Sequence, residues 1–260
     1  MSLVVTHSQN AEWQTVYERS GTLETSRYQP TIDYCKQLAG ASKMITYTTF
    51  GKSPQGRDLP MLIVDRDGLT TPEAIHASGR TLLLMEACIH AGECEGKDAG
   101  LMLIRDMILG GKANINPVEK ESPPATKLLD NVSILFIPIF NVDGHERFGP
   151  FNRINQNGPT EMGWRTNANN LNLNRDFLKA DTPEMQAWLQ MFNKWMPDFF
   201  IDSHTTDGAD YQYTLTYDIE KSENQYSGTV NWINEKFIPN MTSRVEKDGY
   251  FVAPYINLKG

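Results

Sequence analysis

The stretch Thr81-Leu82-Leu83-Leu84-Met85-Glu86-Ala87-Cys88-Ile89-His90-Ala91-Gly92-Glu93 decides the fold that this sequence predicts. Its first nine residues are almost all apolar, which is typical of a strand covered on both faces. The strand ends in a His, two small residues and a Glu, and residues 93–109 continue with helical spacing. In open α/β sheets, ligands bind beyond the carboxyl ends of the strands, so His90 and Glu93 are candidate metal ligands.

The length and charge of the chain limit its function. Its 260 residues are 40% hydrophobic and carry a formal net charge of -8. A chain of this length can bury a full core, and we predict a single domain over residues 1–260. The acidic balance argues against nucleic acid or an anionic membrane surface as the main partner. No apolar run is long enough to span a membrane, so a small molecule or a peptide is the better expectation.

The cellular compartment does not follow from the N-terminus. Residues 1–7 lack the charge and the apolar core of a signal peptide. We expect a secreted or periplasmic protein if a signal peptide was removed ahead of Met1, and a cytoplasmic one otherwise. The three cysteines, Cys35, Cys88 and Cys94, do not make a disulfide framework. Cys88 is interpreted as a small hydrophobic residue of the core.

The rest of the chain alternates between strand and helix patterns. Apolar runs predict five further strands: 44–50, 59–64, 132–140, 199–201 and 211–217. The first two are expected to form a hairpin. Helical spacing predicts helices within 11–39, and Gly21 and Pro30 are the expected breaks between them. It also predicts a helix that begins after Thr182 and another over 230–245. Turn and loop residues predict irregular segments: 71–79, 113–124, 141–144 and 148–174. The last segment is long, and such segments in compact domains are more often functional than neutral.

A third candidate ligand follows another strand. His204 comes directly after the short strand 199–201 and the pair Asp202-Ser203. His90, Glu93 and His204 can therefore meet at one edge of the sheet, although His204 alone reads equally well as a hydrogen-bonded structural residue. Three of the five histidines are less suitable. His7 lies in a polar terminus, His76 in a loop, and His145 in a turn after a strand, which makes His145 the alternative ligand.

Five motifs in order extend this pattern: His90-Ala91-Gly92-Glu93, Asn141-Val142-Asp143-Gly144, Trp164-Arg165, Leu173-Asn174-Arg175-Asp176-Phe177 and Ser203-His204. With them the sequence resembles the zinc metallocarboxypeptidases, the carboxypeptidase A-like family. Carboxypeptidase A is itself a standard example of a zinc site made from two His and one Glu. The resemblance implies an α/β fold, a three-layer α/β/α sandwich with a mixed, mostly parallel central sheet of about eight strands. It also implies one Zn2+ per chain and hydrolysis of the C-terminal peptide bond of peptides with a free C-terminus.

The resemblance gives the matched residues roles. His90, Glu93 and His204 would bind zinc and leave one position open for a water that the metal acidifies. Arg165 would be the catalytic cation that stabilises the oxyanion of the tetrahedral intermediate. Asn174 and Arg175 would bind the terminal carboxylate of the substrate, which makes the enzyme an exopeptidase.

The sequence departs from the family pattern in two places. Asn172 stands where the family often has an Asp that accepts the free ring N–H of the first zinc His, and an amide lends that ring less basicity. The family's general base, a Glu on a late strand, and its substrate-covering Tyr have no counterpart. Four late glutamates lie in polar or helical stretches and are interpreted as solvated charges: Glu220, Glu223, Glu235 and Glu246. We expect the natural polypeptide to continue beyond Gly260, to complete the domain and to supply both residues.

Two other functions remain open at this point. The same ligands suit a zinc-dependent deacylase or amidase acting on N-acyl amino acids or cell-wall peptides. The missing Glu also suits a non-catalytic module that binds zinc or peptide C-termini. Arg165 and Arg175 favour the carboxypeptidase, because a carboxylate-binding group beside an oxyanion-stabilising cation is the peptidase arrangement.

Overall fold

The computed structural model describes residues 12–109, 125–220 and 225–255. The loop predicted at 113–124 and Glu223 lie outside these residues. Contacts within the chain divide it into two compact units, residues 1–207 and residues 208–260, and each is described here by itself. Whether they form the one domain that the sequence predicts stays a prediction. All the candidate ligands lie in the first unit.

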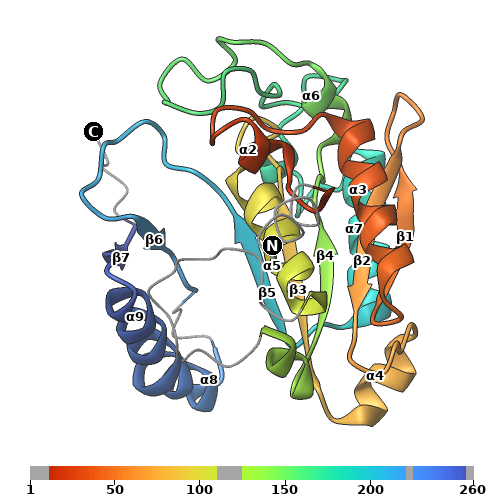
Figure 1. Ribbon diagram of the computed structural model, residues 1–260, viewed down its shortest axis with the longest axis vertical. Helices are drawn as coiled ribbons and strands as arrows, with labels where there is room; N and C mark the ends of the chain where they lie inside the picture. The colour runs from red at the N-terminus through yellow and green to blue at the C-terminus, as the bar shows by residue number, and fades with distance from the viewer. Residues whose placement is uncertain (1–11, 110–124, 221–224, 256–260) are drawn as a thin grey trace, which may run out of the picture. The chain divides into compact units, whose positions relative to one another are not determined.

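A five-stranded sheet forms the centre of the first unit (Figure 1). In spatial order its strands are β1 (Ile45–Lys52), β2 (Asp58–Val64), β4 (Val132–Ile137), β3 (Thr81–Ala87) and β5 (Phe199–Ser203). The β1–β2 and β2–β4 pairs are antiparallel, whereas β3 is parallel to both β4 and β5. The predicted mixed α/β sheet is thus confirmed. Within the described residues, this sheet has fewer strands than the eight or so that the resemblance implied, and half of its strand pairs are parallel.

Helices cover both faces of this sheet, as a sandwich requires. Alternate residues of β2 divide between two apolar clusters, because successive side chains of a strand point to opposite faces. Leu62 and Val64 pack with helices α3 (Tyr28–Ala41) and α5 (Glu95–Ile108), whereas Met61 and Ile63 pack with helices α4 (Pro72–Ser78) and α7 (Pro183–Trp195). The described residues of this unit also include helices α2 (Val16–Arg19) and α6 (Val142–Glu146) and two 3-10 turns, Ala125–Asp130 and Leu173–Arg175.

Three local predictions were wrong, each for a reason of helix geometry. Residues 71–79 were read as a loop but contain α4, because Thr71 caps the helix by accepting from Ala74 N and Pro72 fits its first turn. Residues 141–144 were read as a turn but begin α6, where the side chain of Asn141 accepts from Gly144 N. Pro30 does not break a helix, because it lies in the first turn of α3, where its missing N–H costs no hydrogen bond.

The second unit is small and has a sheet of its own. Strands β6 (Leu215–Tyr217) and β7 (Val252–Pro254) pair in parallel. The helix predicted at 230–245 corresponds to α8 (Ser227–Trp232), a π-helical segment (Ile233–Phe237) and α9 (Ile238–Lys247). The strand predicted at 211–217 covers only its last three residues. In the part of the chain that the structure describes, no helix has both the length and the apolar character needed to cross a membrane.

Candidate metal and substrate site

The candidate site lies where β3 and β5 end side by side. Ala87 pairs with Ser203, so the residues that follow each strand emerge at the same edge of the sheet. A tight turn then leads from β3 into α5, with Glu93 N donating to His90 O at 2.9 Å. Gly92 is required in this turn, because a Cβ there would lie 2.6 Å from Gly163 O. The turn therefore depends on close packing against Gly163, two residues before Arg165.

The structure brings His90, Glu93 and His204 together. Nδ1 of His90 lies 3.0 Å from Glu93 Oε1, and Nδ1 of His204 lies 2.9 Å from Glu93 Oε2. One ligand atom from each of the three residues lies within 4.8 Å of the other two. His90 and Glu93 are buried and His204 is partly exposed, so one side of the group is accessible.

The outer nitrogens of both imidazoles are held by oxygen atoms. His90 Nε2 donates to Asn172 Oδ1 at 3.2 Å, and His204 Nε2 donates to Asp202 Oδ2 at 2.8 Å. A carboxylate or amide oxygen can only accept, so Nε2 of each ring must carry a proton. Both Nδ1 atoms face Glu93, and a metal would bind them in place of their hydrogen bonds to this carboxylate. Ligating histidines usually have such an outer partner.

The charges in this group shift its proton equilibria. Burial lowers the pKa of His204, but hydrogen bonds to Asp202 and Glu93 outweigh that effect and raise the pKa to about 10. Burial raises the pKa of Glu93, but the two histidines, with Arg153, hold it far below its usual value. The metal-free group is therefore a carboxylate hydrogen-bonded to a protonated imidazole. A metal must displace that proton to bind His204 Nδ1.

Two arginines also face Glu93. Arg165, predicted from the sequence, is partly exposed, and its Nη1 lies 3.4 Å from Glu93 Oε1. Arg153, which the sequence analysis missed, is buried and forms an ion pair with the same oxygen. No motif marks Arg153, because it lies in an irregular segment without periodicity. A fixed positive charge at this place is suited to a developing oxyanion.

The two predicted carboxylate-binding residues lie next to this group. Asn174 Nδ2 is 3.5 Å from His204 Nε2. Arg175 follows it in a 3-10 turn, is exposed to solvent, and donates from Nη1 to Asn174 O at 2.7 Å. Asn172 begins the same turn and accepts from Asn174 N at 3.0 Å. One short turn thus carries both the His90 partner and the two proposed substrate contacts.

Asp202 was not assigned a role from the sequence, although a pattern pointed to it. It precedes His204 by two residues, and residues two apart in a strand share a face. Glu86 lies opposite Asp202 in the sheet register. Burial and then the charge of Asp202 raise the pKa of Glu86 well above its usual value. Asp202 therefore acts in the site through Oδ2, which accepts from His204 Nε2.

The Asn141-Val142-Asp143-Gly144 motif has a structural part in the site. Asn141 Nδ2 donates to Ile89 O at 3.4 Å and to Arg165 O at 3.2 Å, which ties the end of β3 to the Arg165 segment. Asp143 is buried and pairs with Arg57 at 2.7 Å. His145, the alternative ligand, is separate from His90 and His204. It lies in a second group with Cys88 and Cys94.

The late glutamates give no candidate for a general base in this unit. Glu220, Glu235 and Glu246 belong to the second unit and are exposed. The donor set at the sheet edge nevertheless fits zinc, since it offers two imidazole Nδ1 atoms and one carboxylate with an accessible side. Both outer ring nitrogens already have the partners that a zinc-binding histidine needs.

Comparisons with known proteins find relatives over most of this chain. A profile of the zinc carboxypeptidase family matches residues 31–257. Carboxypeptidase 2 of Trichophyton rubrum is 24% identical over 248 residues, covering 92% of this chain and 41% of that protein. This chain therefore spans about two fifths of that relative's length.

Solved structures share the fold at low identity. A metallo-carboxypeptidase from Burkholderia cenocepacia superimposes with a TM-score of 0.61 and 20% identity, over 89% of this chain and 54% of that chain. A metallo-carboxypeptidase from Pseudomonas aeruginosa, in complex with (2-guanidinoethylmercapto)succinic acid, gives a TM-score of 0.60 and 19% identity, over 90% of this chain and 53% of that chain. This likeness shows a common fold.

Proposed function

Because the chain belongs to the zinc carboxypeptidase family, we propose that His90, Glu93 and His204 bind one zinc ion and that the protein hydrolyses the C-terminal bond of peptides. The observation that carries the proposal is the convergence of both Nδ1 atoms on the two Glu93 oxygens. When bound, zinc polarises the scissile carbonyl and acidifies a water molecule. The accessible side of the group leaves room for both.

The chain's own residues would bind and orient the substrate. Arg165 is proposed to stabilise the oxyanion, since its guanidinium already lies within 3.4 Å of a ligand carboxylate. Asn174 and Arg175 are proposed to bind the terminal carboxylate through an amide donor and a guanidinium fork. Asn174 lies close to His204, and Arg175 is exposed and thus able to reach an incoming anion. Binding a free carboxylate would restrict cleavage to the last residue.

The proposal is tested first by peptide hydrolysis. Peptides with a free and with an amidated C-terminus are compared for kcat/KM, with and without the substitution Arg175→Met. We expect the free acid to be preferred by about 100-fold, because the amide cannot form the charge-assisted pair. Arg175→Met should remove most of that preference. The exposed Arg147, substituted in the same way, serves as the control.

The same experiment separates the other candidate functions. Equal cleavage of both peptides would exclude the terminal-carboxylate role of Arg175 and favour an amidase. Binding of the free acid without cleavage would favour a binding module. Calorimetry on the 260-residue chain can supply the binding result, with (2-guanidinoethylmercapto)succinic acid, the ligand of the Pseudomonas relative, as a carboxylate-bearing probe.

A further inference from the structure

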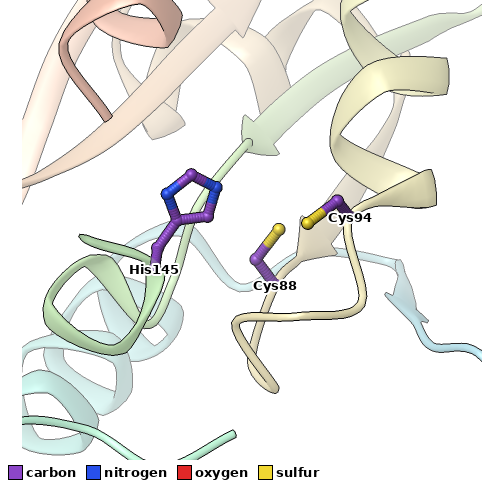
Figure 2. A group of neighbouring side chains, drawn as sticks. All are labelled: Cys88, Cys94 and His145. Atoms are coloured by element: carbon purple, nitrogen blue, oxygen red, sulfur yellow. The ribbon is translucent and has the colours of Figure 1, made fainter. Parts of the chain in front are cut away.

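Apart from the candidate site, a second group of side chains could hold a metal ion. Cys88 directly follows β3, Cys94 is the N-cap residue of α5, and His145 belongs to α6. Figure 2 shows the two sulfur atoms and the imidazole facing a common space. One ligand atom from each residue lies within 4.8 Å of the other two, and all three residues are at most 1% exposed. Two parts of the sequence, the β3–α5 turn and α6, thus place these donors together in the interior.

The imidazole of His145 has unsatisfied polar atoms. Neither Nδ1 nor Nε2 makes a hydrogen bond within the described residues, although the side chain is fully buried. The carboxylate oxygen paired with it, Glu146 Oε1, is 3.9 Å from Nδ1, beyond hydrogen-bonding distance. Buried polar atoms are normally hydrogen-bonded, so an unpartnered imidazole points to a missing ligand.

The two thiols are also weakly engaged. Cys88 Sγ and Cys94 Sγ contact the carbonyl oxygens of Glu93 and Ala91, each at 3.5 Å. A thiol is a weak hydrogen-bond donor, so these contacts hold the sulfur atoms only weakly. The backbone of Cys88 has a φ of 59°, in the left-handed region that few residues other than glycine adopt. Such a conformation persists only when the surroundings impose it, and it is often found at functional sites.

The surrounding charges favour a divalent cation. Lys97 Nζ lies 3.9 Å from Asp98 Oδ1, so these two buried charges offset each other. As thiolates, Cys88 and Cys94 would carry two further negative charges. A divalent ion neutralises them, whereas a monovalent ion leaves a buried net charge, which is costly. Two thiolates and one imidazole are a soft donor set of the kind that selects zinc.

We propose that Cys88, Cys94 and His145 form a second metal site, which binds a thiophilic divalent ion of the zinc type. This site is distinct from the group of His90, Glu93 and His204 and does not depend on the proposed function. Cys88 and Cys94 bracket the five residues 89–93, which include two ligands of the first group. An ion bound to both cysteines fixes the two ends of that turn, so the second site is a structural support for the first.

The test measures metal content and ligand type in the 260-residue chain, purified under reducing conditions. We expect two zinc ions per chain by mass spectrometry of the metal. Replacement by Co2+ should give a near-ultraviolet thiolate-to-cobalt charge-transfer band, which the His90, Glu93 and His204 group cannot produce because it has no thiolate. Cys88→Ser and Cys94→Ser should each lose this band and one zinc ion. His204→Ala should lose one zinc ion and keep the band, so failure of the first site is distinguishable from failure of the second.

Cys35→Ser is the matched control, because Cys35 is equally buried but lies in α3, away from the group. It should keep both metal ions and the band. The cobalt spectrum of the unsubstituted chain decides the matter even if the serine variants fail to fold. Absence of the band in that chain overturns the proposal.

Discussion

The β3–α5 turn contributes to two side-chain groups that differ in how their polar atoms are satisfied. In the open group, formed by His90, Glu93 and His204, all four ring nitrogens have oxygen partners. In the closed group, formed by Cys88, Cys94 and His145, both ring nitrogens lack such a partner among the described residues. The open group therefore has protein partners without a metal. If the closed group binds the metal that we propose, metal binding there should contribute directly to folding.

The largest effect we expect is on metal at the open group. Glu93→Gln removes the carboxylate on which both imidazoles converge. A partner outside the metal ligands typically changes affinity about 10- to 100-fold, so loss of a ligand should exceed 100-fold. Competition with a chelator would measure the affinity, and the thiolate-to-cobalt band should be unchanged. Glu95→Gln, an exposed change two residues on, is the control. Loss of both ions in the Glu93 variant would show that the two groups are not independent.

The second effect concerns stability without metal. Arg153 is buried against Glu93, and breaking a buried ion pair costs roughly 3 kcal/mol or more. Arg153→Met should therefore lower the free energy of unfolding of the metal-free chain by about 3 kcal/mol. With zinc bound the loss should be smaller, because the cation supplies the positive charge. Denaturation in urea with and without zinc measures both. An equal loss of unfolding free energy with and without zinc would mean that Arg153 acts by packing alone. Arg147→Met, at an exposed position, is the matched control.

These two groups also show what a sequence can and cannot predict. The strand ends that place His90 and His204 at one sheet edge follow from apolar runs, because parallel neighbouring strands end together. The same reasoning gave the hairpin of β1 and β2, whereas the layered α/β fold came from the family resemblance. It did not give the strand count, nor the division of the contacts into two compact units.

Arg153 was beyond such reasoning because side-chain hydrogen bonds, rather than periodicity, shape its segment. Asn167 Oδ1, for example, accepts from the backbone of Asn169 and Leu171. His145 was misplaced for a related reason. An Asn followed two residues later by Asp-Gly reads as a turn, yet the same Asn caps a short helix here. Hydrogen-bond partners far apart in the chain are not visible in local patterns.

The third prediction concerns pH at the open group. The raised pKa of His204, about 10, means that zinc must displace a proton from this ring at neutral pH. Affinity should rise about tenfold per pH unit from pH 6 to 9, since one proton is released. Asp202→Asn removes a carboxylate that raises this pKa, so the His204 ring loses its proton at lower pH. The rise of zinc affinity with pH should then be less steep. Zinc titrations across pH measure it. An unchanged slope would show that another group supplies the proton.

The smallest effect would come from restoring the family's Asp beside the first histidine. In Asn172→Asp a carboxylate would replace the amide oxygen that accepts from His90 Nε2, which makes the ring a stronger donor to zinc. The same oxygen accepts from Asn174 N, and a carboxylate can keep both bonds. We expect zinc at the open group to bind less than about 10-fold more tightly, because only the partner's basicity changes and its geometry does not. Asn170→Asp, an exposed change just before the turn, should leave the affinity as it is. If Asn172→Asp weakened binding instead, the neutral amide would be favoured at this position because Glu93 and Asp202 already give the group ample negative charge.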